Sequence, residues 1–310
     1  MLKSDAGLQA NLMPRLATAA GIAIREDVAF TNADGKENKK IRQRAETTLQ
    51  RLQEPLRRVL QQDEAVLYVL RAQSPVSLVQ QVTTGWYIYQ LTQCVLVVTN
   101  RRLLQFQVEP GLFSRDAWKW RSSWRMVAWG DVKDIKLSGL LACEMYLTYL
   151  NGKKEKFWGI ERKDKKKLEL LLARLAPSTQ GEMTSASGIV QLCPKCAAAL
   201  ASGIYSCASC GQRFKDEQTA RIRSILIPGG GYFYTGMIWL GIVDAIVESF
   251  LLLALLALTL EAAGIVPPDA GQAPASWGMV GFMLVIIAIE KWVTIYHSQH
   301  RVRDYMPISH

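Results

Sequence analysis

Four cysteines are the residues of this chain whose type and spacing point most directly to chemistry. Cys193 and Cys196 form one Cys-x₂-Cys pair, Cys207 and Cys210 form a second, and ten residues separate the pairs. Each pair can place two thiolates on one metal ion, and Gly211 supplies the backbone freedom that such turns use. Four thiolates at about 2.3 Å around a tetrahedral ion suit Zn²⁺, and this closed shell leaves no position for a reacting water. The spacing therefore predicts one structural Zn²⁺ per chain.

Two other uses of the cysteines stay open: iron in a rubredoxin-like site, and a redox dithiol. The occurrence of both pairs together argues against a redox dithiol. Residues 191–216 are similar to zinc ribbons, which implies a structural or protein-docking module. Nucleic-acid binding is a competing interpretation, because the region and its flank are basic through Lys195, Arg213, Lys215, Arg221 and Arg223. Few aromatic residues accompany these charges and no recognition helix is visible, so we expect no nucleic-acid partner.

The histidines exclude the commonest hydrolase chemistries. All three, His297, His300 and His310, lie within the last 14 residues. A Ser/His/Asp or Cys/His site in the first 296 residues would therefore lack its imidazole, and we expect a protein that is not an enzyme. The chain opens without the basic-then-apolar pattern of a signal peptide, so we expect reduced thiols. Cys94 and Cys143, in strand-like runs, are predicted to be inert core thiols.

Basic charge is concentrated in the first two thirds of the chain. Residues 1–192 carry 29 basic and 19 acidic side chains, whereas residues 224–310 carry three and six. Two stretches stand out, 153–167 and 115–125, and the second interleaves basic residues with three tryptophans. A solvated surface is the alternative for the first stretch. We predict that both face anionic lipid or an acidic partner protein, through Arg121, Arg125, Lys163, Lys165, Lys166 and Lys167.

The N-terminal residues divide into two parts. Residues 1–35 carry no sustained apolar period and are predicted to be a poorly specified segment. Within 36–62, apolar residues recur at spacings of three and four, which predicts an amphipathic helix. Pro55 lies inside this pattern and predicts a kink or a fresh helix start. We expect the helix to pack on the next domain, and a coiled coil or a membrane-surface helix is the alternative.

Residues 63–176 have the texture of a strand meander. Short β-branched and aromatic runs occur at 66–70, 86–91, 94–99, 103–108, 118–129, 145–150 and 157–160. Asn151-Gly152, between the last two runs, predicts a hairpin with a type I′ turn. Residues 164–176 then carry a leucine stripe that predicts a helix capping one end of a barrel.

This order of elements resembles the bacterial pleckstrin-homology-like domains. The resemblance rests on Val-Val-Thr-Asn-Arg-Arg-Leu-Leu at 97–104, Trp-Gly-Asp-Val-Lys-Asp-Ile at 129–135, the Asn-Gly hairpin and the final helix. It implies a seven-stranded, roughly orthogonal antiparallel barrel with a C-terminal helix, used to bind lipid or protein. Residues 177–190 are small and polar and are predicted to be a flexible linker.

Two long apolar segments follow, at 237–259 and 277–296. About 20 residues cross the hydrocarbon core of a bilayer, so residues 224–300 are predicted to contain two transmembrane helices. The loop at 261–276 has no Lys or Arg, whereas basic residues precede the first helix and follow the second. The positive-inside rule then places both ends, including the tail 301–310, in the cytoplasm. We expect the protein in the bacterial cytoplasmic (inner) membrane.

Ionisable residues interrupt both apolar segments. Asp244 and Glu248 lie in the first, and Glu290 and Lys291 in the second. Charges at membrane depth are costly, and a pair between Asp244 and Lys291, which lie at similar depth, would lower that cost. Glu248 and Glu290 then lack an obvious basic partner within one hairpin, which favours a homo-oligomer or an acidic partner surface. The alternative is that these charges snorkel or line a wet interhelical seam. A proton or ion pathway is a further alternative.

A glycine-rich motif precedes the first apolar segment. The stretch resembles the entry to small two-transmembrane-helix hairpin domains, and the matching residues are Pro228, Gly229, Gly231, Phe233, Tyr234, Gly236 and Gly241. The glycines are expected to let a short turn lie close against the hairpin. The acidic and basic signature that this family carries between its helices is absent here, because the connecting loop is proline-rich.

These observations predict a multidomain α+β membrane protein. A cytoplasmic N-terminal helix, a pleckstrin-homology-like domain and a zinc ribbon would be tethered to a two-helix transmembrane hairpin. The expected function is that of an adaptor that binds a partner protein or anionic lipid through its soluble part. A transporter or channel subunit that uses the intramembrane acids is one alternative, and a membrane-tethered nucleic-acid sensor is another.

Overall fold

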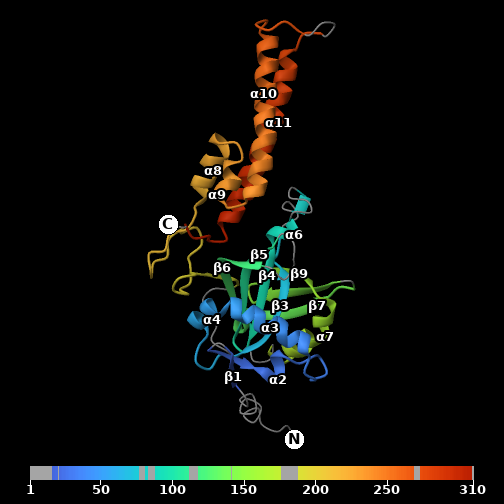
Figure 1. Cartoon of the computed structure of the whole chain (residues 1–310), viewed down its shortest axis with the longest axis vertical. Coiled ribbons are helices and arrows are strands. Elements are labelled where there is room, and N and C mark those ends of the chain that lie inside the picture. Colours follow the sequence, from blue (N-terminus) through green and yellow to red (C-terminus); the bar gives the residue numbers. More distant parts are fainter. Residues whose placement is uncertain are drawn as a thin grey trace. The chain divides into compact units, whose positions relative to one another are not determined.

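The computed structural model describes residues 16–19, 21–76, 81–82, 88–111, 118–140, 142–175, 188–268 and 273–308. The chain divides into two compact units (Figure 1). Unit 1 runs to residue 202 and includes 207–212, and unit 2 comprises 203–206 and everything from 213 onward. The four clustered cysteines belong to unit 1, and both long apolar helices belong to unit 2.

Unit 1 is built on one open, largely antiparallel sheet, so the predicted α+β class is confirmed. Hydrogen-bonded neighbours run in the order β10-β6-β5-β4-β3-β9-β8-β7, and β2 pairs with both β1 and β3. Six of the seven predicted runs coincide with strands. The strands are β1 (Leu16–Ala19), β2 (Ile22–Arg25), β3 (Val66–Gln73), β4 (Gln93–Thr99), β5 (Arg102–Pro110), β6 (Trp118–Ala128), β7 (Val132–Ser138), β8 (Cys143–Tyr149), β9 (Lys154–Ile160) and β10 (Val190–Leu192).

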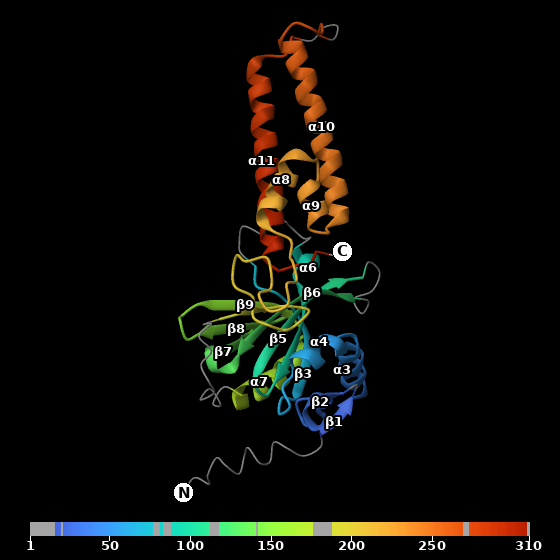
Figure 2. The ribbon, with the colours of Figure 1, turned by 90° about the vertical axis from the view of Figure 1, so that its left-hand side faces the viewer.

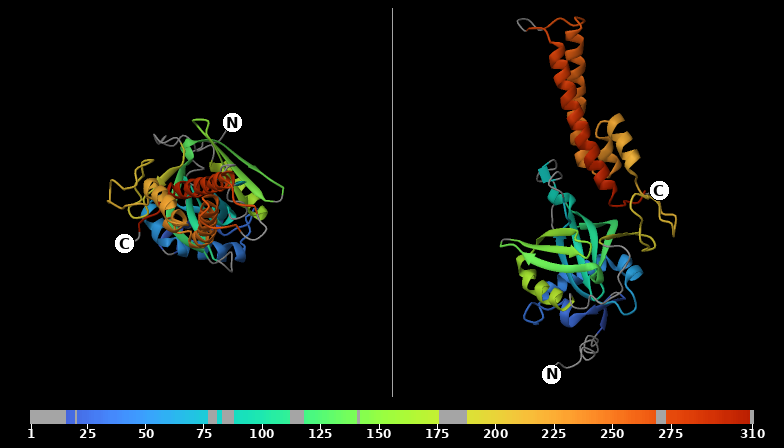
Figure 3. Two further views of the ribbon diagram at one scale, coloured as in Figure 1. Left: turned by 90° about the horizontal axis from the view of Figure 1, so that it is seen from above. Right: turned by 180° about the vertical axis from the view of Figure 1, so that it is seen from behind.

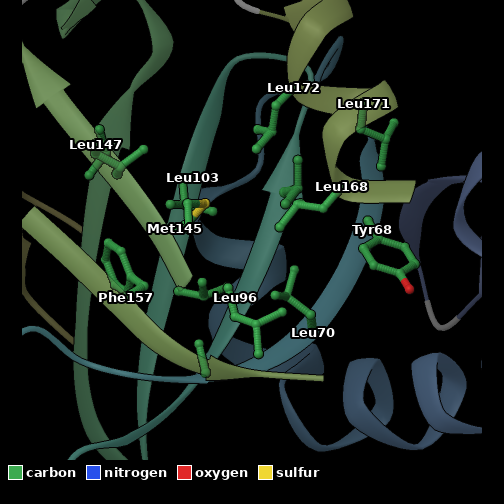
Figure 4. Packing of buried hydrophobic residues seen from close by; sticks show 14 of the residues in the cluster. Tyr68, Leu70, Leu96, Leu103, Met145, Leu147, Phe157, Leu168, Leu171 and Leu172 are labelled. Carbon is green, nitrogen blue, oxygen red and sulfur yellow. The ribbon is translucent and has the colours of Figure 1, made fainter. Parts of the chain in front are cut away.

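The sheet bends so that β3 to β6 cross β7 to β9 at a steep angle (Figure 3). A short 3₁₀ turn at Trp129–Asp131 joins the two groups of strands. Helix α7 (Arg162–Leu175) packs against the apolar side chains between the groups (Figure 4). The leucine stripe predicted for this helix is buried as expected, at Leu168, Leu171, Leu172 and Leu175.

The opposite face of β3 to β6 is covered by N-terminal residues. Ile22 and Ile24 of β2 and Phe30, which follows α2 (Glu26–Ala29), are almost fully buried there. Residues 22–30, within the segment predicted to be poorly specified, therefore contribute side chains to the core. Because β4 is covered on both faces, its sequence reads as one apolar run, whereas burial alternates along β8.

The predicted amphipathic helix is two helices, α3 (Lys39–Arg51) and α4 (Gln53–Val59). The side chain of Asn38 caps α3 by accepting hydrogen bonds from the second and third N–H groups of the helix, those of Lys40 and Ile41. Pro55 falls in the first turn of α4, where its missing N–H costs no helical hydrogen bond, so the predicted fresh start is confirmed. The apolar side chains of both helices are buried against the sheet, which leaves no apolar face for a coiled coil or a membrane surface.

The hairpin between β8 and β9 is confirmed, but its turn is not the predicted type I′. The N–H of Tyr149 donates to the carbonyl of Lys153 at 2.9 Å, which closes a loop of three residues. Gly152 has a φ of 82°, whereas Asn151 is not in the left-handed region. The Asn151 side chain instead accepts from the N–H of Lys153 at 3.0 Å. One left-handed glycine therefore closes a longer loop.

Two further segments differ from the predictions. A strand was expected at 86–91, but its described part, residues 88–91, forms the short helix α6 (Ile88–Leu91). Most of the predicted linker 177–190 lies outside the described residues. At its end, β10 pairs with β6, and Val190 lies opposite Met126. The chain between the sheet and the cysteines therefore returns as an edge strand.

Unit 2 is helical. Its helices are α8 (Glu217–Leu226), α9 (Gly230–Tyr234), α10 (Ile238–Ala262) and α11 (Trp277–Val302). The last two form a long hairpin, and α8 and α9 lie beside one end of it (Figure 2). Residues 213–215 pair with 306–308, so the last described segment is tied to the start of the unit.

Candidate functional site

The four cysteines converge on one point. The sulfur atoms of Cys193, Cys196, Cys207 and Cys210 all lie within 4.8 Å of one another. The shortest separations are 3.6 Å between Cys193 and Cys210 and 3.5 Å between Cys196 and Cys207. Metal–sulfur bonds of about 2.3 Å in a tetrahedral site place the sulfurs about 3.8 Å apart. The thiols therefore have the number, chemistry and spacing that a tetrahedral metal site requires, and none is in a disulfide.

Both Cys-x₂-Cys pairs are held by the same backbone turn. The N–H four residues after the first cysteine donates to its carbonyl at 2.9 Å, from Ala197 to Cys193 and from Gly211 to Cys207. The N–H of each first cysteine donates to the carbonyl five residues later, at 2.8 and 2.9 Å. Ala197 has a φ of 60° and Gly211 a φ of 70°. Sequence reasoning singled out Gly211 but missed Ala197, because alanine gives no signal for a left-handed backbone.

Backbone N–H groups also point at the first sulfur of each pair. Burial raises the pKa of Cys193 to about 12, although the N–H groups of Cys196 and Lys195 oppose this shift. Burial also raises the pKa of Cys207, but hydrogen bonds from the N–H groups of Cys210 and Ser209, together with those to the side chains of Cys196 and Cys210, bring the pKa to about 7. Hydrogen bonds to the charged form stabilise a thiolate, the form in which cysteine binds metal.

Cys94 and Cys143 lie far from this chemistry. Both side chains are buried in the core between the two groups of strands. Burial raises the pKa of Cys94 to about 12 and also raises the pKa of Cys143. Among the described residues, neither thiol belongs to a group of side chains that could hold a metal ion, which agrees with the inert role predicted for them.

One lysine of the predicted basic surface is not on the surface. Lys167 is 5% exposed, and its ammonium donates to the carbonyl oxygens of Val28 and Thr31 and lies over the ring of Tyr68. Burial lowers the pKa of this lysine to about 8. Its assignment to a membrane or partner surface is therefore wrong, because the amine ties α7 to α2 and to the residue Thr31 that follows it.

The other three lysines of the predicted binding surface, Lys163, Lys165 and Lys166, do reach the surface. Lys163 and Lys166 are exposed and Lys165 is half-buried. Lys163 forms an ion pair with Glu161, and Lys166 lies 3.2 Å from a carboxylate oxygen of Asp34. Exposed pairs of this kind contribute little to stability, so these lysines can exchange partners.

The second basic stretch also differs from its prediction. Trp118 and Trp124 are 7% and 1% exposed and belong to the core on the outer face of the sheet. Arg121 is half-buried and donates to the carbonyl of Leu91 at 3.0 Å, and Arg125 is half-buried as well. Trp120 is half-buried, so the interleaved tryptophans and arginines belong to a largely buried strand and two of the three tryptophans offer no aromatic surface.

Sequence reasoning missed a buried charge network in unit 1. Asp164 is 1% exposed, and both its oxygens accept from the guanidinium of Arg44, at 3.0 and 2.9 Å. The hydroxyl of Tyr68 donates to the same carboxylate at 2.7 Å. The three residues tie α7, α3 and β3 together over more than 90 positions of sequence. A pattern of neighbouring residues in the sequence cannot predict contacts over such separations.

In unit 2 the predicted pair between Asp244 and Lys291 is not formed. Lys291 instead forms an ion pair with Glu248, which is 2% exposed, and donates to the carbonyl of Ser224 at 2.6 Å. The Glu248 carboxylate also accepts from the N–H of Gly229 at 3.3 Å. Glu248 therefore has the basic partner that the sequence did not show, and Lys291 links α11 to α8 and α10.

The remaining two acids lie next to this pair. The hydroxyl of Thr294 donates to Glu290 at 2.9 Å and lies 3.3 Å from an oxygen of Asp244. Ligand oxygens of Asp244, Glu248 and Glu290 lie within 4.8 Å of one another. One polar seam between α10 and α11 therefore holds all four predicted intramembrane residues.

The glycine motif lets the helices of unit 2 approach closely. A Cβ on Gly229, which has a φ of 67°, would overlap the carbonyl oxygen of Gly241. A Cβ on Gly231 would overlap the hydroxyls of Ser224 and Ser298, and one on Gly241 would lie 2.7 Å from the ring of Phe233. The predicted close turn against the hairpin is therefore confirmed.

The other motif residues have different parts. Pro228 follows α8, and Gly236 has a φ of 80° at the turn from α9 into α10. The hydroxyl of Tyr234 accepts from the N–H of Asp216 at 3.1 Å. The motif is thus explained by backbone geometry and by one tyrosine that anchors α9 to the start of α8.

Comparisons with known proteins add little. No protein-family model and no curated protein matches the chain. Among solved structures, the C-terminal domain of an unknown protein from Leishmania infantum is similar, with 14% sequence identity and a TM-score of 0.23 over 36% of this chain and 84% of that chain. A TM-score this low carries no argument about fold or function.

Proposed function

We propose that the protein is a membrane-anchored adaptor. In this account unit 2 is a two-span membrane hairpin, and unit 1 is a pleckstrin-homology-like domain with a structural zinc site that binds an acidic partner protein. The observation that carries the proposal is the exposure of the two long apolar helices. Each helix is at least 25 residues long. Only 11% of the most apolar 18-residue stretch of each helix is buried.

The length and surface of these helices support the membrane proposal. At about 1.5 Å per residue the 25 residues of α10 extend about 38 Å, which exceeds the hydrocarbon core of about 30 Å. Phe250, in the middle of α10, and Phe282, in the second turn of α11, are 71% and 68% exposed. A core helix of a soluble protein would bury such side chains.

The orientation follows the positive-inside rule, with the loop at 261–276 outside and unit 1 in the cytoplasm. A cysteine introduced by Ala273→Cys in that loop should react with a membrane-impermeant maleimide in intact bacterial cells. A cysteine introduced by Leu140→Cys, at an exposed position of unit 1, should react only after lysis. Reversed labelling would contradict the orientation.

The strand order of unit 1 supports the pleckstrin-homology-like proposal. Seven consecutive strands, β3 to β9, lie in the order β6-β5-β4-β3-β9-β8-β7, and the helix α7 follows the last of them. The strands form a meander of four and a meander of three. The two meanders are joined where β3 pairs with β9, with Gln73 opposite Trp158. The two crossing groups with a terminal helix are what the sequence resemblance implies.

Zinc is the metal that the donor set fits best. Four thiolates without an open position suit a structural Zn²⁺, and Cys193, Cys196, Cys207 and Cys210 would hold it. When bound, the ion supplies no reaction and cross-links the two turns. Iron would fit the same geometry, and elemental analysis separates the two.

The partner-binding surface is proposed on the exposed side of α7. The substitutions Lys163→Glu, Lys165→Glu and Lys166→Glu reverse three charges without touching the buried Lys167. A control with the same charge change is Lys119→Glu, Lys133→Glu and Lys154→Glu, all exposed elsewhere on unit 1.

The test is copurification of the full chain from detergent-solubilised membranes. The α7 variant should lose an acidic partner that the control variant retains. If both variants keep every partner, the α7 surface is not the binding site. If instead both lose affinity for vesicles containing phosphatidylglycerol, anionic lipid is the ligand of unit 1.

A transport role for unit 2 is the second candidate, and the polar seam of Asp244, Glu248 and Glu290 favours it. Two spans enclose no pore alone, so this role needs a homo-oligomer. Blue native electrophoresis reports the assembly, and proton flux into proteoliposomes reports transport. Flux that Asp244→Asn abolishes would establish this role, and a monomer without flux would exclude it.

A further inference from the structure

Two basic side chains of unit 2 lie against one aromatic ring. The ammonium of Lys215 is 5.6 Å from the ring centroid of Tyr234, and the guanidinium carbon of Arg223 is 4.8 Å from it. The two charges are thus no farther apart than these two distances added together. Among the described residues, no carboxylate forms an ion pair with either side chain.

Three segments fix this arrangement. The N–H of Lys215 donates to the carbonyl of Met306 at 3.0 Å, within the pairing of residues 213–215 with 306–308. Arg223 stands on α8, and Asp216 caps that helix by accepting from the N–H of Thr219 at 2.7 Å. The hydroxyl of Tyr234 lies 3.3 Å from the Asp216 carboxylate, so the ring is held at the foot of α8. Asp216 is thereby engaged by the cap and the tyrosine.

A third basic residue adds to the positive potential. Burial, together with the charges of Arg301 and Arg223, lowers the pKa of Lys215. Arg301 pairs with Asp304 at 3.2 Å, so it is partly neutralised. Like charges held together on a folded surface are stabilised when an anion binds between them. The cluster therefore fits an anionic ligand.

The C-terminal half of α8 carries exposed apolar side chains. Ile222, Ile225 and Leu226 are 47%, 51% and 72% exposed. The hydrogen bond from Lys291 to the carbonyl of Ser224 holds this half of α8 beside α11, at a residue within the second apolar segment, 277–296. The polar half of α8 and its exposed apolar half therefore match the boundary between headgroups and hydrocarbon, and Arg223 can snorkel toward Tyr234.

We propose that Lys215 and Arg223, held on the ring of Tyr234, bind the phosphate of an anionic phospholipid headgroup in the cytoplasmic leaflet. The acyl chains of this lipid lie along the exposed apolar side chains of α8. A guanidinium and an ammonium supply charge-assisted hydrogen bonds to phosphate oxygens, and basic groups at the cytoplasmic surface attract anionic lipids. The inference rests on the proposed membrane insertion of unit 2.

The experiment uses the delipidated full chain in a neutral detergent, with dioleoyl phosphatidylglycerol as the probe. Bound lipid is counted by native mass spectrometry as its concentration rises. The double variant Lys215→Gln, Arg223→Gln should bind this lipid about 30-fold more weakly, which is about 2 kcal/mol. The control Arg221→Gln removes an exposed charge from the same helix and should bind as the unaltered chain does.

Three further arms make the outcome decisive. Arg223→Lys keeps the charge and should keep most of the binding, which shows that a folded variant is being measured. Phosphatidylcholine should bind at least tenfold more weakly than phosphatidylglycerol, and millimolar inorganic phosphate should not displace the lipid. The proposal is overturned if the double variant binds as the control does, if both lipids bind equally, or if phosphate competes. Release of the chain from membranes by alkaline carbonate would instead refute the insertion on which the proposal rests.

Discussion

The two units treat the same apolar residue types in opposite ways. In unit 1, Phe106 and Phe157 are fully buried, and the sheet between them is covered on both faces. In unit 2, Phe250 and Phe282 are 71% and 68% exposed on long helices that touch few other elements. One unit of the chain therefore buries its large apolar side chains, and the other unit exposes them. The proposed membrane insertion of unit 2 accounts for this difference, because lipid would then cover the apolar side chains that unit 2 exposes.

Each unit also contains a buried ion pair. In unit 1 the carboxylate of Asp164 is 1% exposed and meets Arg44. In unit 2 the carboxylate of Glu248 is 2% exposed and meets Lys291. Each pair joins segments that are distant in sequence and receives an additional hydrogen bond, from Tyr68 or from the N–H of Gly229. Such pairs fix which elements pack together, and breaking one partner leaves an unpaired charge.

The largest effect is expected from metal loss in unit 1. Elemental analysis of the full chain should give one zinc per chain, and Cys207→Ser should abolish it. Structural zinc sites contribute about 10 kcal/mol or more to the folding of their own segment, so the turns around Cys193 and Cys207 should lose protection against hydrogen exchange. The helices of unit 2 should keep theirs. A variant that still holds one zinc per chain would refute the ligand assignment.

The next largest effect is expected in unit 2. Glu248→Gln leaves the ammonium of Lys291 without its carboxylate and should lower the free energy of unfolding by about 3 kcal/mol, measured by denaturation in mixed micelles. Glu261→Gln, at the far end of α10, removes a carboxylate that accepts from the backbone N–H of Ala275 at 2.9 Å and forms no ion pair with another described residue, so it should cost less than about 1 kcal/mol. Equal losses in the two variants would show that the ion pair has no special weight.

The close packing of the glycine motif should give a smaller effect. Gly241→Ala places a Cβ 2.7 Å from the ring of Phe233, which must move, and should cost about 1 to 2 kcal/mol in the same denaturation experiment. The matched control is Gly281→Ala on α11, where a Cβ meets nothing within 4 Å. Should both variants be neutral, the motif does not act through close approach.

The smallest effect concerns the two cysteine turns, which share one backbone shape but differ at one residue. Ala197→Gly relieves a left-handed alanine and should raise zinc affinity about fivefold, which is about 1 kcal/mol. Gly211→Ala, in open space with a φ of 70°, should lower it by a similar factor. Competition with a chelator measures both. If both substitutions raise the zinc affinity, or both lower it, the two cysteine pairs do not share one turn geometry.

Sequence reasoning identified features that depend on spacing or composition. Cys-x₂-Cys pairs, a leucine stripe and long apolar segments are local patterns. The structure brings the cysteines together, buries the leucines and forms long helices from the apolar segments, as expected. It failed where a partner lies far along the chain. Lys167 looked exposed because the carbonyls that bury it belong to Val28 and Thr31, more than 130 residues away.

The mistaken pairing of Asp244 with Lys291 has a similar cause. The pair was predicted because the two residues lie at similar depth along α10 and α11. A third segment determines which carboxylate Lys291 contacts. Ser224 of α8 and Gly229 after it supply a carbonyl and an N–H at the level of Glu248, so the lysine and that carboxylate meet there. Helix periodicity contains no information about where α8 folds back.

The central claim is that unit 2 is embedded in a membrane and anchors unit 1. The most direct measurement is alkaline carbonate extraction of membranes from cells that produce the full chain, followed by detection in pellet and supernatant. The account predicts that the chain stays in the pellet and is released only by detergent. Recovery of the folded chain in the carbonate supernatant would contradict it, because the exposed apolar helices would then require a protein partner in place of lipid.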